Sequence, residues 1–320
     1  MTLVRWRTIV FALATLTVAA VPVHAQIDGL EIVAPANPGS GFDQTSRAVQ
    51  EALLKNGLAK GIQVVNVPGA GGTIGLAQFA AGNKPGASLL MIGVTTVGAI
   101  LTNKPQVTLD DAYPLALLLR EYSVLVVPTK SDITTVAGLA AKVKANPATV
   151  RWGVGSAGGI DHVIAGQFTK AVGADPRKLN PIHYPGGGEQ LAAIMGGIVT
   201  VGVGGVPEMA SQIKSGRLRA LAVSSPERLA GLDVPTLKEQ GVDVALGTWR
   251  GLMARKRATD AERKDLGAAI EKMVATPTWK STLEKYGWLD AYRSSEGFGT
   301  FLKEQNAMMK GALEDLGVIK

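Results

Sequence analysis

Four glycine-rich segments recur along the chain, and each lies between a short apolar run and a segment with helical periodicity. They occupy residues 38–43, 68–73, 155–159 and 184–188. Short strands that pass through glycine-rich turns into helices are typical of βα units around a parallel sheet. The sequence therefore predicts an α/β fold.

The apolar runs and periodic segments alternate over most of the chain. No long polar linker interrupts them, which favours two lobes joined by crossing strands over two independent domains. We expect lobe 1 to comprise residues 26–125 and 223–320, with a mostly helical tail packed back on it, and lobe 2 to comprise residues 126–222. Strands are predicted at residues 30–34, 62–67, 89–94, 124–127, 151–154, 180–183, 199–203 and 218–224, and helices at 44–56, 73–81, 136–145, 160–172, 189–195 and 208–215.

The first 25 residues have the pattern of a secretory signal peptide. Arg5 and Arg7 precede an apolar run over residues 8–21, and the segment ends in a small-x-small cleavage site at Ala25. This run is shorter than the ~20 residues that cross a bilayer as a helix. We therefore expect cleavage near Ala25 and export to the periplasm.

The composition excludes several kinds of site. Cysteine is absent, which rules out disulfides, thiolate catalysis and sulfur-based metal centres. His162 and His183, the two histidines beyond the signal segment, lack the short spacing of a helical metal site. The tight basic cluster at residues 255–257 lies in a chain with few aromatic residues, unlike a nucleic-acid-binding surface. We expect no metal, no cofactor and no nucleic-acid partner.

The positions of the glycine loops indicate anion binding. The first turn of a helix carries unpaired backbone N–H groups and a partial positive charge, and glycine lets a ligand approach them closely. In open α/β sheets, ligands bind at the carboxyl ends of the strands, where these loops lie. For any single loop, the alternative that its glycines only form a turn stays open.

Several side chains in these loops have two interpretations each. Asp43 either caps the following helix or meets a ligand ammonium, and Phe42 is either a cleft wall or part of the core. Ser156 either donates to a ligand carboxylate or caps a helix. His162 either orients its loop or touches ligand, and the Tyr184 hydroxyl either binds ligand or the ring merely packs. His183, in a predicted strand, is interpreted as structural.

Two enzyme motifs are incomplete. Gly153, Gly155 and Gly158 form G-x-G-x-x-G after a predicted strand, but Asp175 does not end a second strand as a dinucleotide site requires. A hydrolase elbow fails because a valine stands two positions before Ser156. We expect no catalytic residue; an exported α/β enzyme that acts on a small organic acid is the alternative.

The loops also carry a family resemblance. Residues 34–47 read Ala-Pro-Ala-Asn-Pro-Gly-Ser-Gly-Phe-Asp-Gln-Thr-Ser-Arg, and residues 66–75 read Asn-Val-Pro-Gly-Ala-Gly-Gly-Thr-Ile-Gly. Both stretches resemble the extracytoplasmic receptors of tripartite tricarboxylate transporters, and their sequences are most similar to those of the citrate-type branch. Ser40 stands where this family commonly has glycine. The resemblance continues over residues 155–162, 184–188, 216–223, 234–236 and 249–251.

The resemblance implies a periplasmic-binding-protein fold of the second type, with two Rossmann-like lobes that close on a ligand. It implies a receptor and not an enzyme, with a di- or tricarboxylate such as citrate as the ligand; amino acids and aromatic acids, which the family also binds, are the alternatives. It also implies a monomer that delivers its ligand to two integral membrane subunits; a sensor role is the alternative. Carried over to this chain, the ligand-binding residues are Ser40, Gly41, Phe42, Asp43, Ala70, Gly71 and Thr73 on one side of the cleft and Ser156, Gly158, His162, Tyr184 and Gly186 on the other. We expect Gly71→Val to abolish binding and to leave the fold largely intact.

Overall fold

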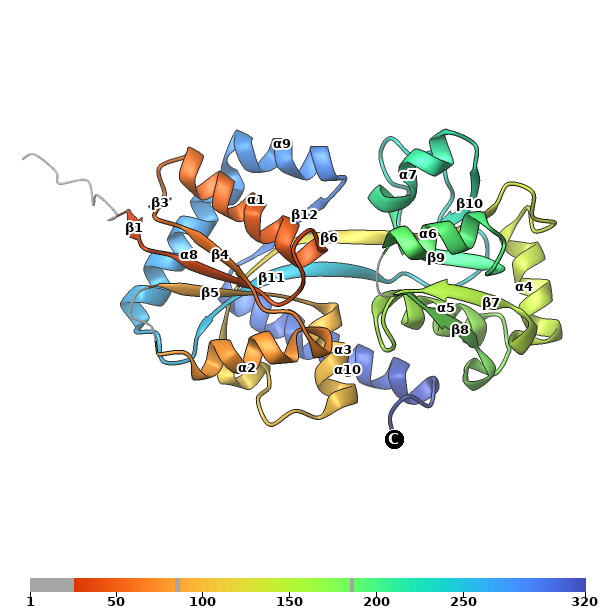
Figure 1. The fold of residues 1–320 in the computed structure, drawn as a ribbon, viewed down its shortest axis with the longest axis horizontal. Coiled ribbons are helices and arrows are strands. Elements are labelled where there is room, and N and C mark those ends of the chain that lie inside the picture. Colours follow the sequence, from red (N-terminus) through yellow and green to blue (C-terminus); the bar gives the residue numbers. More distant parts are fainter. Residues whose placement is uncertain (1–25, 84–86, 185–186) are drawn as a thin grey trace, which may run out of the picture.

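One long strand, β6 (Ala112–Pro128), runs through both halves of the molecule, and β11 (Gly247–Arg255) lies antiparallel beside its first part (Figure 1). The computed structural model describes residues 26–83, 87–184 and 187–320. Most strands of this part of the chain form one sheet, with the order β4-β2-β5-β11-β6-β9-β7-β8 and with β10 and β12 also paired to β6. Because β6 serves both ends of this sheet, it joins two α/β lobes.

Lobe 1 contains the parallel strands β2 (Glu31–Ala34), β4 (Gln63–Asn66) and β5 (Ser88–Gly93). All six residues of β5 are buried, as expected for a strand covered by helices on both faces. A small two-stranded sheet joins β1 (Ile27–Asp28) to β3 (Ala59–Lys60), and β12 (Leu289–Arg293) pairs with β6. The helices of this lobe are α1 (Gly41–Lys55), α2 (Thr73–Ala81), α3 (Val94–Asn103), α8 (Asp260–Ala275), α9 (Pro277–Tyr286) and α10 (Ser295–Asp315).

Lobe 2 contains the parallel strands β7 (Arg151–Val154), β8 (Asn180–His183) and β9 (Val201–Gly205). Strand β9 runs antiparallel to the second part of β6, and so does β10 (Leu218–Val223). Helices flank this part of the sheet as well (Figure 1). They are α4 (Val136–Ala145), α5 (Ile160–Ala171), α6 (Gly187–Met195) and α7 (Val206–Lys214).

The C-terminal segment packs on strand β11 of lobe 1. The fully buried Trp249 of β11 makes edge-to-face contacts with Phe298 and Phe301 of α10. Helix α10 also reaches lobe 2, where Asp315 forms an ion pair with Lys170 of α5 at 2.6 Å. The last helix therefore contacts both lobes on one side of the molecule.

The predicted lobe boundaries fall inside strands of the sheet and not between them. The boundary after residue 125 lies within β6, and the boundary after residue 222 lies at the end of β10. We keep the division as a prediction of which segments move together. The predicted signal peptide lies outside the described residues. Within the described residues, no helix is both long enough and apolar enough to span a membrane.

Candidate functional site

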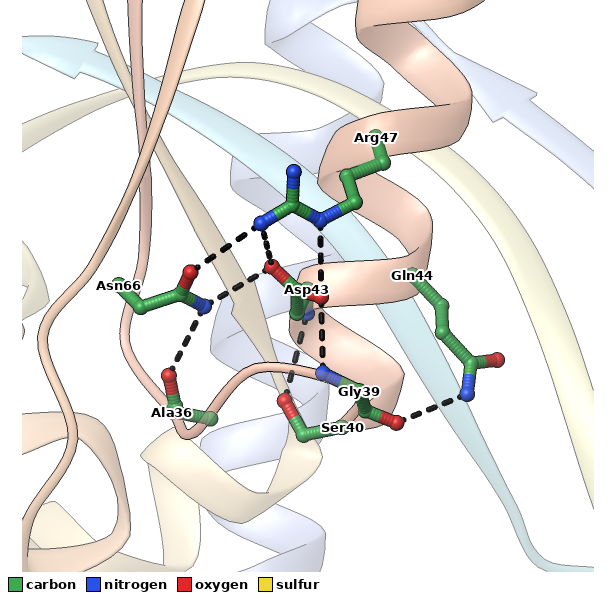
Figure 2. Close-up of polar contacts among 7 residues, drawn as sticks. All are labelled: Ala36, Gly39, Ser40, Asp43, Gln44, Arg47 and Asn66. Carbon is green, nitrogen blue, oxygen red and sulfur yellow. Dashed lines mark hydrogen bonds and ion pairs between the residues drawn. The ribbon is translucent and has the colours of Figure 1, made fainter.

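The first glycine loop is held by the carboxylate of Asp43 (Figure 2). Ser40 caps α1, and its hydroxyl accepts the N–H of Asp43 at 3.3 Å. The Asp43 carboxylate accepts the backbone N–H of Gly39 at 2.8 Å, Nε of Arg47 at 3.0 Å and Nδ2 of Asn66 at 2.9 Å. Because Asn66 ends β4, Asp43 connects the loop after β2 to the start of the loop after β4.

The environment of Asp43 favours its charged form. Burial by itself raises the pKa of this carboxyl, but the hydrogen bonds from Arg47, Gly39 and Asn66 outweigh burial and lower its pKa. The sequence offered Asp43 as the cap of this helix or as a contact for a ligand ammonium. The N-cap is instead Ser40, and the described partners of Asp43, in the first turn, belong to lobe 1, so its carboxylate braces the loop.

The second loop is built by close packing. Gly71 has a φ of 66°, and a Cβ added there would lie 2.5 Å from Cβ of Ala99 in α3. Thr73 begins α2, and its hydroxyl donates to the carbonyl of Ala70 at 3.0 Å. The sequence alone suggested that Gly71→Val would remove binding and leave the fold largely intact. That expectation is wrong, because valine at this position would be strained and would collide with Ala99.

The third loop is held by a histidine. The N–H of Gly158 donates to Nδ1 of the buried His162 at 3.1 Å, and the His162 ring packs edge-on against His183. Gly158 has a φ of 72°, and a Cβ added there would lie 3.2 Å from Cγ2 of Thr102 in α3. Tyr184 is partly buried against apolar residues of lobe 2. Gly186 lies outside the described residues.

A cavity of about 200 Å³ lies between the lobes, at the carboxyl ends of β5, β7 and β9. Ser156 is the predicted binding residue that lines it. Gly41 and Phe42 lie behind Arg250, a residue of its wall. The other predicted residues that the structure describes lie outside the lining of this cavity. The wall is formed by Thr95, Glu121, Tyr122, Ser123, Thr248 and Arg250 together with Gly155, Ser156, Gly159, Ile160, Asp161, Gly205 and Glu208.

Arg250 supplies the cation of this cavity. Its guanidinium donates to the carbonyl of Trp249 at 3.0 Å and to the Thr248 hydroxyl, and it lies 4.9 Å from the centre of the Phe42 ring. Within the described residues it forms no ion pair with a carboxylate. Burial lowers its pKa, whereas Glu121 and Glu208 raise it. A guanidinium stays charged even so, and it is suited to hold a carboxylate.

Three carboxyl groups face the same cavity. Burial raises the pKa of Asp161 to about 7 against the hydrogen bond from Ser123, and nearby Glu208 and Glu121 raise it further. Burial also raises the pKa of Glu121, which Arg250 partly offsets. The pKa of Glu208 is raised by burial as well, against a hydrogen bond from the backbone of Gly205. The cavity therefore contains more acidic groups than basic ones.

Sequence reasoning missed these four charged residues. Arg250 and Asp161 lie inside stretches that carry the family resemblance, but only the glycines and polar residues around them were assigned to the site. Glu121 follows an apolar run and was not assigned to any element. An acid between two apolar segments, where a strand must pass through a polar cleft, was the available signal.

A second, larger cavity of about 760 Å³ lies elsewhere, at the amino ends of β7 and β9. Arg151 and Arg217 line it, together with Met195. Ligands of α/β sheets bind at the carboxyl ends of the strands. We therefore take the smaller cavity between the lobes as the candidate site.

The dinucleotide interpretation finds no support in the geometry. Asp175 accepts the N–H of Arg177 at 3.0 Å and caps the short 3₁₀ turn Pro176–Lys178. It is thus engaged in a local turn after α5 and does not end a strand beside the glycine loop.

Two α/β lobes, joined by crossing strands and enclosing a polar cavity, define the class of two-lobed solute-binding proteins. Residues 45–318 match the model of the tripartite tricarboxylate transporter family receptor (TctC), and the chain belongs to this family. The fold class and the family predicted from the sequence are thereby confirmed.

Individual relatives agree with this assignment. The UPF0065 protein in the gbd 5′ region of Cupriavidus necator is 28% identical over 318 residues, which are 97% of this chain and 95% of the relative. Protein BugT of Bordetella pertussis is 29% identical over 233 residues, 71% of this chain and 70% of the relative.

Solved structures show the same fold. A TctC solute binding protein from Polaromonas is 28% identical with a TM-score of 0.74, covering 90% of this chain and 99% of that one. The periplasmic binding protein BugD is 23% identical with a TM-score of 0.77, covering 92% of this chain and 98% of that one. The family and these structures are solute-binding receptors and not enzymes, which confirms the prediction that this chain is no enzyme.

Proposed function

We propose that this chain is an exported receptor that captures a small carboxylate between its lobes and delivers it to the two integral membrane subunits of a tripartite transporter. Its work is binding, and no bond of the ligand is made or broken. Because residues of both lobes line the cavity, ligand contacts with both lobes favour a closed arrangement.

The observation that carries this proposal is the convergence of helix N-termini on the cavity. Thr95 belongs to the first turn of α3, and Gly159 and Gly205 are the N-caps of α5 and α7. Arg250 lies against Gly41, the first residue of α1. A helix N-terminus without an acidic side chain in its first turn, as at α3, offers backbone N–H groups and a partial positive charge, which suit a carboxylate.

Proteins of the same fold support a carboxylate as the class of ligand. A Rhodopseudomonas palustris protein was solved with adipate, at 19% identity to this chain and a TM-score of 0.77. MatC from the same species was solved with bound malate, at 20% identity and a TM-score of 0.75. A di- or tricarboxylate such as citrate, as expected from the sequence, is the narrower form of this proposal.

Export and partners are part of the same proposal. The expected signal peptide over residues 1–25 directs the chain to the periplasm, where it acts as a monomer. Solved proteins of this fold are described as a periplasmic transporter and a periplasmic binding protein, which supports this location. The ligand-binding residues predicted from the loops, with Ser156 lining the cavity, remain our assignment of the two sides of the cleft.

A thermal-shift screen tests the function. The chain from residue 26 onward is unfolded, dialysed and refolded, then heated with citrate, other di- and tricarboxylates, amino acids and aromatic acids. A ligand at a hundredfold excess over its Kd stabilises the native state by ~2.7 kcal/mol. We expect at least one acid to raise Tm and to be recovered unchanged. A flat response to every acid, or conversion of the bound acid, would contradict the proposal.

A further inference from the structure

The side of the cavity that faces lobe 1 is positively charged. A Cβ added at Gly41 would lie 2.6 Å from Nη2 of Arg250, and one added at Gly93 would lie 3.2 Å from Nη1. Gly41 begins α1, and Gly93 is the N-cap of α3, which has no side-chain cap. The guanidinium and two helix N-termini are therefore gathered at one pole of the cavity.

The side of the cavity that faces lobe 2 is negatively charged. A Cβ added at Gly205 would lie 2.8 Å from Oε1 of Glu121 and 3.6 Å from the carboxyl carbon of Glu208. Asp161 lies in the same wall and accepts the Ser123 hydroxyl at 3.0 Å. Glu121 forms no hydrogen bond or ion pair within the described residues. In the described part of the chain, Arg250 therefore offsets the charge of this carboxylate only at a distance, without a direct contact.

The helix N-termini of lobe 2 are already used by side chains of the protein. Glu208, in the first turn of α7, accepts a hydrogen bond from the backbone of Gly205. Asp161, in the first turn of α5, accepts one from the backbone of Gly155. A ligand carboxylate would meet these acids at the lobe 2 pole. At the lobe 1 pole no acidic side chain among the described residues lines the cavity, and Asp43 in the first turn of α1 is paired with Arg47.

The charges do not balance within the cavity. Among the described residues of the wall, the acids Glu121, Glu208 and Asp161 face one cation, Arg250. Closing the lobes on a ligand removes water, and buried carboxylates without a counter-charge are costly. No group of three or more metal-ligating side chains in the described residues is arranged to hold a metal ion. Protonation can neutralise Asp161, whose pKa is about 7. For the acids that stay ionised, a cationic group of the ligand would supply the counter-charge.

We propose that the ligand is an amphoteric carboxylate, with its carboxylate against Arg250 and the N-terminus of α3 and a protonated amine against Glu121 and Glu208. This inference rests on the proposed function and narrows the class of ligand. It disfavours citrate and other polyanions, because each further carboxylate would face the acidic pole. The class includes amino acids and other amino-substituted carboxylates.

Matched ligand pairs test this inference. 3-Aminopropanoate and succinate, 4-aminobutyrate and glutarate, and 5-aminovalerate and adipate differ mainly in whether one end is an ammonium or a carboxylate. Their affinities are measured by isothermal titration calorimetry at pH 7.5, beside the amino acids and citrate of the thermal-shift panel. We expect the tightest ligand of the whole set to carry a protonated amine and to bind at least tenfold tighter than its diacid counterpart.

Two other outcomes would distinguish a failure of the amphoteric-ligand proposal from a failure of the receptor function. If citrate or a diacid binds more tightly than every amine, the amphoteric ligand is wrong and the carboxylate receptor stands. If no acid of either kind binds, the receptor function itself is wrong, and the amphoteric ligand with it.

Variants locate the acidic pole. Glu121→Gln and Glu208→Gln should each weaken the tightest amine at least tenfold and should weaken its diacid counterpart less. Glu304→Gln, an exposed acid on α10, is the matched control and should change neither affinity. Melting curves without ligand show whether each variant is folded. Folded variants that bind the amine as tightly as the unmodified chain would overturn the assignment of this pole.

Discussion

The backbone N–H of Gly158 donates a hydrogen bond to Nδ1 of His162 at 3.1 Å, so this ring nitrogen carries no proton. Burial and the neighbouring His183 lower the pKa of His162 to about 4. The loop that enters α5 thus depends on a neutral histidine.

His162 makes stability depend on pH. Its folded-state pKa lies below the ordinary value of 6.5. Between pH 6.5 and 4, His162 is therefore protonated in the unfolded chain and neutral in the folded chain. The free energy of unfolding should therefore fall as pH falls through this range. Urea denaturation of the unmodified chain and of His162→Asn, which keeps an acceptor without titrating, measures this contribution. Equal slopes for both proteins would contradict the assignment.

Asp161 makes folding stability depend on pH in the opposite direction. Burial raises its folded-state pKa to about 7, so between pH 4 and 7 the folded chain holds a proton that the unfolded chain has lost. Stability should fall as pH rises through this range, by up to about 4 kcal/mol in total. Asp161→Asn keeps an oxygen to accept the Ser123 hydroxyl and should remove this loss. Urea denaturation of both proteins at pH 5 and pH 7.5 measures this effect. If the free energy of unfolding changes between the two pH values by the same amount in both proteins, Asp161 is not the cause of the loss.

Asp43 should support the stability of lobe 1. Asp43→Asn removes the charge that holds Arg47 and the N–H of Gly39, and we expect a loss of about 1–3 kcal/mol at pH 7. Since the folded-state pKa is lowered, this contribution is present above the unfolded pKa near 4 and is lost as pH falls through the folded-state value. Asp28→Asn, which breaks an exposed ion pair with Lys60, should cost less than ~1 kcal/mol. A loss from Asp43→Asn no larger than this control would be inconsistent with the bracing role.

Gly41 should matter for binding more than for folding. An alanine Cβ there would lie 2.6 Å from Nη2 of Arg250 and must displace the guanidinium, while α1 itself tolerates alanine. We expect Gly41→Ala to weaken the tightest carboxylate at least tenfold, with a change of less than ~0.5 kcal/mol in unfolding. Gly311→Ala on α10 is the control, because a Cβ there meets no atom within 4 Å and this position lies outside the glycine loops. Calorimetry with equal affinities for both variants would count against Arg250 as a ligand contact.

Local patterns predicted the regular βα units well. The helix over 73–81 and the strands over 151–154 and 180–183 have the bounds that the sequence predicts, because glycine or proline marks their ends. The first part of β6 was missed. Residues 115–119 are uniformly apolar and give no period, and the charges of Arg120 and Glu121 resemble the end of an element.

The site could be predicted only in part, for a related reason. The glycine loops are local features, and their position between strand and helix is visible in the sequence. Glu121 and Arg250 come from β6 and β11, more than a hundred residues apart, and only the pairing of these strands brings them to one cavity. Helix α3 was also missed, because Thr95, Thr96 and Val97 are β-branched and favour strands.

The central claim is that a small carboxylate binds between the lobes, and a crystal structure with the tightest acid of the screen tests it most directly. We expect the ligand in the cavity bounded by Arg250, Ser156 and Thr95, with a carboxylate oxygen within hydrogen-bonding distance of the guanidinium. A ligand bound instead in the larger cavity beside Arg151 and Arg217 would contradict this account.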